Sequence, residues 1–240
     1  MTRLDVRVYE LGFAESRSKA HELILSGSVT VNGETVTKPS EPVNPEARLE
    51  LVCAPKYIGR AGYKLETAAD AFGIDFTDLI CLDAGAAAGG FTDLMLQKGA
   101  KKIYAVDVGE NQLHRSLRQN PRVISAEKQD IRTLALPERV DFITADLSFI
   151  SLKLIIPCFR ELLKANGACI VLIKPQFEAG KRHFKNGIIK DGKIIKQIVR
   201  GIEDFITEQG YQLIGTIPSK LNEKGRNQEF LCYFKRGTDL

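Results

Sequence analysis

The sequence predicts an α/β protein: a seven-stranded, mostly parallel sheet preceded by a small α+β module. From residue 60 onward, short apolar runs alternate with longer segments of helical periodicity, the pattern of strands joined by crossover helices. Before residue 53, two helical segments precede β-prone runs around Asn32-Gly33, a dipeptide typical of tight hairpin turns. We therefore expect a module over residues 1–52, a linker over 53–59 and a large domain over 60–240.

The composition is that of an ordinary globular protein. Of 240 residues, 44% are hydrophobic and 27% charged, with a formal net charge of +4. No apolar run is long enough to span a bilayer, and the N-terminus lacks the apolar segment of a secretion signal. The five cysteines are scattered without a C-x-x-C pair. We expect a cytoplasmic protein with no membrane partner and no metal site; the oligomeric state is not predicted, with a monomer favoured.

In the small module, helical spacing predicts helices over 4–11 and 16–25, and β-prone runs predict strands over 28–31, 34–37 and 48–52. The same reasoning applied to the large domain predicts helices over 60–72, 91–98, 113–119, 150–163 and 192–208. Its seven predicted strands are 79–83, 103–107, 123–126, 140–145, 168–173, 211–216 and 229–234, of which the final pair is antiparallel.

Residues 79–93 form the segment around which the large domain is organised. They predict a strand, a tight Gly/Ala-rich loop and a helix start, and Gly85, Gly89 and Gly90 leave room for a ligand against the backbone. A bulky residue at position 89 is expected to fill that room. The dinucleotide fingerprint would need glycine at position 87, which is alanine. With Asp83 before the loop and Asp107 after the next strand, the unit suits a ligand with an amine and a ribose, such as S-adenosylmethionine.

Charged residues follow several predicted strands directly. Asp83, Asp107, Asp130, Asp146 and Lys174 each stand at or just after the end of an apolar run. Any one of them alone could be a helix cap or a surface charge. Because parallel strands end at one edge of a sheet, their recurrence at equivalent positions favours one functional rim.

Residues 1–52 resemble the RNA-binding module of the ribosomal protein S-four type. The resemblance lies in Gly-Phe-Ala-Glu-Ser-Arg-Ser-Lys-Ala and Ile-Leu-Ser-Gly-Ser-Val-Thr-Val-Asn-Gly-Glu. Six basic against eight acidic residues give the module a net charge of −2. RNA binding therefore requires that Arg3, Arg7, Arg17 and Lys19 share one face with the acids turned away; the alternative is a solvated charged surface.

Residues 60–240 resemble the FtsJ-type 2′-O-methyltransferases, and the whole chain resembles the TlyA (hemolysin A) family. Among the stretches that carry this are Asp83-Ala-Gly-Ala-Ala-Ala-Gly-Gly-Phe-Thr-Asp, Asp146-Leu-Ser-Phe-Ile-Ser-Leu and Ile173-Lys-Pro-Gln-Phe-Glu-Ala-Gly. The resemblance implies a Rossmann-like methyltransferase fold. It also implies S-adenosylmethionine-dependent methylation of the ribose 2′-hydroxyl of a cytidine, with ribosomal RNA or a ribosomal subunit as the substrate.

The same resemblance implies the site residues. A catalytic tetrad falls on Lys64, Asp146, Lys174 and Glu229. The expected cofactor contacts are Asp83, Gly85, Ala86, Gly89, Gly90, Phe91, Asp107, Val108, Asp130 and Ile131. A ribose hydroxyl is a very weak acid, so a base must stand beside it. Lys174 suits that role if burial and the nearby Lys64 disfavour its charged form, with Asp146 and Glu229 holding the two lysines.

Two departures from the family pattern concern the cofactor. Relatives usually carry Ser-Thr where this chain has Ala87-Ala88, and Ser-Arg-Gly-Gly where it has Gly59-Arg60-Ala61-Gly62. We expect cofactor binding to be retained with one or two lost hydroxyl contacts, at about 1 kcal/mol each.

Other functions are disfavoured or left open by the sequence. An amino-group methyltransferase is disfavoured because the loop after the fourth strand lacks prolines, and Pro157-Cys158 suits a core cysteine better than a nucleophile. No segment supports membrane damage. A non-catalytic RNA-binding assembly factor remains the alternative.

A basic run predicts an RNA-docking surface. It comprises Lys181, Arg182 and Lys185, followed by Lys190, Lys193, Lys196 and Arg200. The alternative is a solvated loop and helix face. The target nucleotide and the ribosomal subunit cannot be predicted from the sequence.

Overall fold

The computed structural model describes residues 1–52, 56–179, 187–221 and 226–237. The chain divides into two compact units, Met1–Arg60 and Ala61–Leu240, which are described separately. Residues 53–55 of the expected linker lie outside the described ranges, and the division into 1–52, 53–59 and 60–240 stays a prediction.

The N-terminal unit packs two helices on a small antiparallel sheet. Its elements are α1 (Leu4–Glu10), α2 (Arg17–Leu25), β1 (Thr2–Arg3), β2 (Val29–Val31), β3 (Glu34–Thr35), β4 (Pro42–Val43) and β5 (Leu49–Leu51). The sheet order is β3-β2-β5, and β1 pairs separately with β4. The β2–β3 turn is the predicted one, because Asn32 (φ 53°) and Gly33 (φ 86°) both adopt the left-handed conformation that this hairpin needs. Leu4, Val8 and Ile24 belong to its apolar core.

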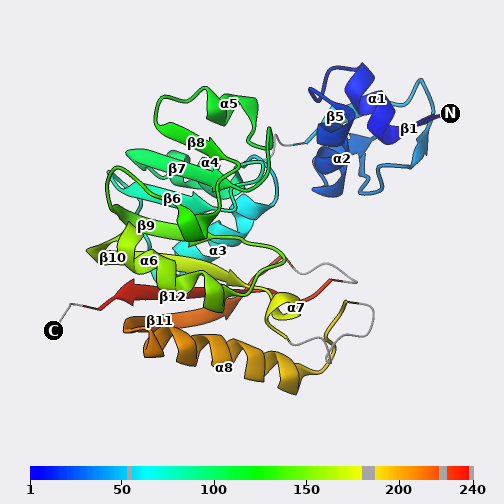
Figure 1. Cartoon of the computed structure of the whole chain (residues 1–240). Coiled ribbons are helices and arrows are strands. Elements are labelled where there is room, and N and C mark those ends of the chain that lie inside the picture. The colour runs from blue at the N-terminus through cyan, green and yellow to red at the C-terminus, as the bar shows by residue number, and fades with distance from the viewer. Residues whose placement is uncertain (53–55, 180–186, 222–225, 238–240) are drawn as a thin grey trace. The chain divides into compact units, whose positions relative to one another are not determined.

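A seven-stranded sheet forms the centre of the second unit, as predicted (Figure 1). Its strands are β6 (Ile80–Ala84), β7 (Lys102–Asp107), β8 (Val123–Glu127), β9 (Val140–Ala145), β10 (Leu163–Ile173), β11 (Tyr211–Pro218) and β12 (Phe230–Arg236). The order across the sheet is β11-β12-β10-β9-β6-β7-β8. β12 is antiparallel to both its neighbours, while the other pairings are parallel.

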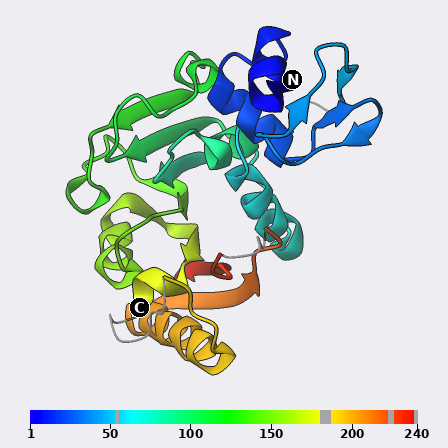
Figure 2. The same ribbon diagram turned by 90° about the vertical axis from the view of Figure 1, so that its right-hand side faces the viewer.

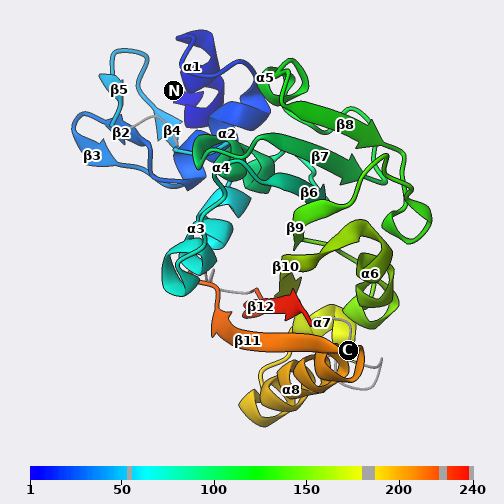
Figure 3. The same ribbon diagram turned by 90° about the vertical axis from the view of Figure 1, so that its left-hand side faces the viewer.

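Helices cover both faces of this sheet. α3 (Ala61–Phe72) and α4 (Gly90–Gln97) pack on each other on one face, whereas α6 (Phe159–Leu162) lies on the opposite side (Figure 3). α8 (Gly192–Glu208) runs beside β11 (Figure 2), where Ile202 and Ile206 are buried. Among the described residues, no helix is long and apolar enough to cross a bilayer.

Three elements differ from the prediction. The helix expected over 150–163 is instead two 3-10 turns, η2 (Leu152–Leu154) and η3 (Ile156–Cys158), and the four-residue α6. Pro157 explains the break, because proline lacks an amide hydrogen and its ring clashes with the preceding turn. The helix expected over 113–119 shrinks to α5 (Arg115–Arg118), and β10 begins five residues before the predicted start at 168.

The strand order fixes where a ligand binds. The chain leaves β6 toward β7 and β8, then crosses back to place β9 on the other side of β6. In sheets of this type, ligands bind beyond the carboxyl ends of the strands at this switch point. Because β12 is antiparallel, with Phe230 opposite Ile173, its first residue meets the same edge.

Candidate active site

Four side chains that lie far apart in the sequence meet at the carboxyl edge of the sheet. Lys174, directly after β10, is 8% exposed, and its Nζ lies 2.6 Å from Oδ1 of Asp146, which follows β9. Lys64, in the first turn of α3, places its Nζ 2.6 Å from Oε2 of Glu229 and 3.7 Å from Oδ2 of Asp146. The structure therefore brings the four predicted tetrad residues into one ion-pair network.

The network balances two cations against two carboxylates in a largely enclosed place. All four side chains are less than one-fifth exposed. Partly buried charges are tolerated only when they are paired with good geometry, and here Asp146 is shared between the two ammonium groups. Two lysines thus face one small region of the sheet edge, where a hydroxyl group would meet both.

Two neighbours of the network were not predicted as site residues. Lys174 Nζ donates a hydrogen bond to Ser148 Oγ at 2.9 Å. Phe149 is 91% exposed with a positive φ of 65°, and its ring lies 5.0 Å from that of Phe177 in α7 (Pro175–Glu178). Ser148 and Phe149 both belong to the Asp146-Leu-Ser-Phe stretch. The sequence did not indicate a site role for Phe149, because a phenylalanine shortly after a buried strand is usually a core residue.

The glycine-rich loop lies directly against Asp146. Gly85 has φ of +79°, and a Cβ there would lie 2.6 Å from the backbone oxygen of Asp146. Asp146 N also donates to the carbonyl of Ala84 at 3.0 Å. Only glycine at position 85 permits this close approach. The glycine-rich loop and the ion-pair network are therefore adjacent at Asp146.

Asp83 shapes the loop from inside. It is 1% exposed, and its carboxylate accepts hydrogen bonds from the amide and hydroxyl of Thr92 and from the hydroxyl of Thr144. Burial raises the pKa of Asp83 to about 6 against the lowering effect of these hydrogen bonds. Its oxygens are thus used within the fold to fix the first turn of α4, and its predicted direct contact with the cofactor stays a prediction.

Two further acids line the edge at β7 and β8. Asp107 accepts from the amides of Ala87 and Gly109 at 2.9 and 2.7 Å, which ties the glycine-rich loop to the end of β7. Asp130 caps η1 (Ile131–Thr133) and pairs with the Arg132 guanidinium, which lowers the pKa of Asp130 to about 2.

The other predicted cofactor residues differ in exposure. Val108 is 73% exposed beside Asp107, whereas Ala86, Phe91 and Ile131 are buried. Gly90 and Phe91 are the first residues of α4, so their amides have no acceptor within the helix.

These groups fit S-adenosylmethionine chemically. Carboxylates suit its ribose hydroxyls and ammonium group, free helix amides suit its carboxylate, and exposed Val108 suits an apolar ring face.

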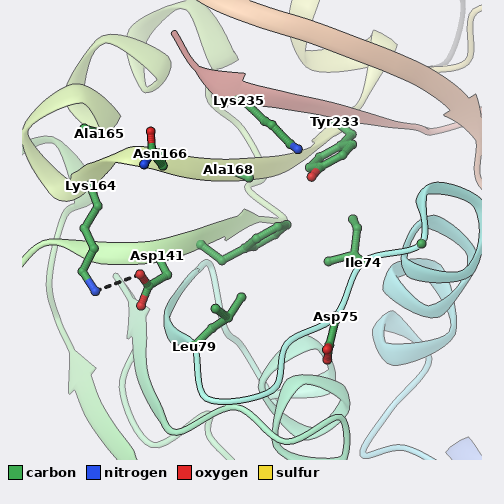
Figure 4. Close-up of a pocket in the computed structure, with 12 residues that line it drawn as sticks. Ile74, Asp75, Leu79, Asp141, Lys164, Ala165, Asn166, Ala168, Tyr233 and Lys235 are labelled. Carbon is green, nitrogen blue, oxygen red and sulfur yellow. Dashed lines mark hydrogen bonds and ion pairs between the residues drawn. The ribbon is translucent and has the colours of Figure 1, made fainter. Parts of the chain in front are cut away.

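A cavity of about 540 Å³ lies at the opposite edge of the sheet (Figure 4). Its lining includes Leu79, Tyr233 and the Asp141–Lys164 ion pair at 2.8 Å, near the starts of β6, β9 and β10. None of the tetrad residues lines it, so this cavity and the charged network are separate. Among the described residues, no group of three or more His, Cys, Asp or Glu side chains could hold a metal ion.

The predicted RNA-binding cations of the N-terminal unit are all paired. Arg3 and Arg17 both contact Asp5, at 2.9 and 3.2 Å. Arg7 pairs with Glu10 and Lys19 with Glu22. Acids therefore lie beside these cations, because neighbouring helix positions and the buried Asp5 bring the opposite charges together, and the RNA-binding role of the four cations stays a prediction. Lys181, Arg182 and Lys185 lie outside the described residues.

Comparison with known proteins gives two family matches. The FtsJ-like methyltransferase family matches residues 57–236, and the S4 domain family matches residues 2–49. A 16S/23S rRNA (cytidine-2′-O)-methyltransferase, TlyA, of Mycobacterium tuberculosis is 35% identical, over 99% of this chain and 91% of that protein. Hemolysin A of Brachyspira hyodysenteriae is 40% identical, over 97% of this chain and 99% of that protein.

A solved structure from Streptococcus thermophilus, named as a hemolysin, shares the fold. It superposes with a TM-score of 0.77 at 38% identity and covers 98% of this chain and 88% of that chain. The likeness therefore extends over both units rather than over the sheet alone.

Replacing Gly89 tests the packing of the loop. A Cβ at Gly89 (φ +96°) would lie 2.2 Å from the Cδ1 of Leu117 in α5 and 2.8 Å from the Cδ1 of Leu113, so a larger residue would have to push these two side chains aside. Gly73 (φ +62°) has nothing within 4 Å and is the matched control for backbone strain. We expect Gly73→Ala to cost about 1–2 kcal/mol and Gly89→Ala about 2–5 kcal/mol in urea unfolding. Equal losses would contradict the close packing of α5 on the loop.

Proposed function

Because the chain belongs to the FtsJ-like methyltransferases, in the family of the TlyA and hemolysin A proteins, we propose that it methylates the ribose 2′-hydroxyl of a cytidine in ribosomal RNA. The methyl donor in this proposal is S-adenosylmethionine, whose sulfonium supplies the methyl group. The observation that carries the proposal is the enclosed network of Lys174, Asp146, Lys64 and Glu229 at the carboxyl edge of the sheet.

The geometry supports a division of roles between the two lysines. Attack by a ribose oxygen needs loss of its proton to a group within hydrogen-bond reach. In this proposal, the Lys174 ammonium first releases a proton to solvent and its Nζ then accepts the proton of the hydroxyl group. The ammonium formed in this way is held by Asp146 and Ser148, which already contact Nζ. Lys64, kept in place by Glu229, supplies positive charge beside the oxygen as it becomes negative.

The surroundings of the network suit an RNA substrate. An exposed aromatic ring, Phe149, lies against Phe177 close to Lys174, and such rings stack on unpaired nucleobases. The N-terminal unit matches the S4 domain family, which supports ribosomal RNA or a ribosomal subunit as the partner. An enzyme with this substrate works in the cytoplasm.

The ion pairs of the N-terminal cations do not oppose RNA binding. The partly exposed pairs of Arg7 with Glu10 and of Lys19 with Glu22 contribute only about 0–1 kcal/mol each, so a phosphate group can replace the carboxylate there. Asp5 is buried and keeps its two partners, but the side chains of Arg3 and Arg17 are more than half exposed and can contact a phosphate as well. Arg3 and Arg17 converge on Asp5, and they are therefore two cations that one phosphate could engage together. We propose Arg3, Arg7, Arg17 and Lys19 as RNA contacts on this basis.

Lys174→Met tests the proposed reaction, with Lys164→Met as its matched control. Both lysines belong to the β10 segment, but Lys164 pairs with Asp141 at the opposite edge of the sheet. We expect Lys174→Met to lower methyl transfer to ribosomal RNA by at least about 10²-fold, the range of general-base catalysis, with cofactor affinity within a few-fold of wild type.

Lys164→Met should transfer methyl groups at the wild-type rate. Full turnover by Lys174→Met would exclude Lys174 as the base. Absence of transfer by the wild-type protein, together with tight RNA binding, would instead support the non-catalytic assembly factor.

A second test concerns RNA docking through α8. Lys193, Lys196 and Arg200 are exposed along its first half. Replacing all three with glutamine should weaken ribosomal RNA binding and reduce the slope of log affinity against log salt by about 2–3, since each phosphate contact contributes about 0.7–0.9. The control is Lys101, Lys128 and Arg139, which are exposed in loops next to β7, β8 and β9. An equal reduction by the control triple would mean that net charge, rather than α8, guides the RNA.

A further inference from the structure

Glu178 is a partly buried carboxylate that the proposed reaction leaves without a role. It ends the short helix α7, four residues after Lys174. Its Oε2 accepts a hydrogen bond from Ser151 Oγ at 2.6 Å, and its Oε1 accepts one from the amide of Leu152 at 2.8 Å. Burial raises the pKa of Glu178, and the two hydrogen bonds lower it in part. Both oxygens therefore face donors from one other segment.

That other segment carries Asp146, the residue of the ion-pair network that contacts both lysines. Residues 146–152 follow β9 and residues 174–178 follow β10, and the two segments touch at three levels. Nearest the sheet, Lys174 contacts Asp146 and Ser148. Next, the rings of Phe149 and Phe177 lie 5.0 Å apart. Outermost are the two hydrogen bonds to Glu178.

The middle of the 146–152 segment needs such support. Phe149 has a positive φ of 65°, a conformation that costs a bulky L-residue strain and persists only where its surroundings hold it. Ser151 Oγ also accepts from the amide of Lys153 and so begins η2. The Glu178 carboxylate thus fixes the outer end of a strained segment whose inner end orients Lys174.

We propose that Glu178 is a positioning residue for methyl transfer: it locks residues 146–152 against α7, so that Asp146 and Ser148 hold Lys174 Nζ in one orientation and Phe149 stays at the mouth of the site. This inference rests on the proposed function. It assigns Glu178 no contact with substrate or cofactor, so its removal changes the rate of transfer and leaves cofactor affinity in place.

The test compares Glu178→Ala with Glu178→Gln. Alanine removes both acceptors. Glutamine keeps the shape, because its Oε1 accepts from Leu152 N while its amide donates to Ser151 Oγ. We expect Glu178→Ala to lower the single-turnover rate of methyl transfer by about 10- to 100-fold, the effect of misplacing a catalytic group. Glu178→Gln should restore the rate to within about threefold, and S-adenosylmethionine affinity by calorimetry should stay within about twofold in both.

Two further variants sharpen the comparison, all measured below the unfolding temperature of each protein. Glu161→Ala removes an exposed carboxylate of α6 and should transfer at the wild-type rate. Ser151→Ala should slow transfer, and combining it with Glu178→Ala should add less than the product of the single effects, because the two residues form one contact.

Several results would overturn the inference. The first is a wild-type rate in Glu178→Ala. The second is an equal loss of rate and cofactor affinity in that variant, which indicates a merely structural role. The third is a Glu178→Gln variant as slow as Glu178→Ala, which indicates a need for charge. These outcomes require an active wild-type protein. If the wild type transfers no methyl group to ribosomal RNA, the proposed function fails first, and the positioning role fails with it.

Discussion

The ion pair between Lys174 and Asp146 is the contact on which the rest of the candidate active site depends. A lysine that is 8% exposed must have an anionic partner, because an unpaired charge in such a place costs several kcal/mol. β9 and β10 are adjacent and parallel, so residues directly after them meet at one edge without further adjustment. The charged pair is therefore a consequence of strand order, and the strand order depends on the apolar core beneath it.

The remaining parts of the site extend from this pair. The antiparallel β12 brings Glu229 to the same edge, and the first turn of α3 adds Lys64, which closes the network. Gly85 lets the glycine-rich loop lie against the Asp146 backbone, which places a cofactor beside the lysines. Asp146 therefore contacts the lysines through its carboxylate and borders the glycine-rich loop through its backbone.

The strands and the charged residues at their carboxyl ends could be predicted from the sequence because they depend on local patterns. The bounds of β9 and α8 are as predicted, since apolar alternation and helical spacing are properties of each segment alone. The placement of Asp146 and Lys174 follows from the rule that parallel strands end at one edge. The resemblance to a known family supplied Lys64 and Glu229, which no local pattern singles out.

What the sequence did not predict depends on tertiary contacts. The helix expected over 150–163 fails at Pro157, although its apolar spacing is helical. Two features are contacts between different segments: Leu113 and Leu117 pack on Gly89, and Arg3 and Arg17 share Asp5. A third, the exposure of Phe149, is a departure from the usual burial of phenylalanine. None of these has a signature in residue spacing, so spacing alone does not show which side chains a residue at position 89 would meet.

The most direct measurement of the central claim is the chemical identity of the methylated nucleoside. Ribosomal RNA would be incubated with the wild-type protein and isotopically labelled S-adenosylmethionine, digested to nucleosides and analysed by mass spectrometry. We expect labelled 2′-O-methylcytidine, because the paired lysines at the sheet edge suit a hydroxyl group rather than a ring atom and the similar TlyA protein is named as a cytidine-2′-O-methyltransferase. Label on the base, or no label in any nucleoside, would contradict this expectation.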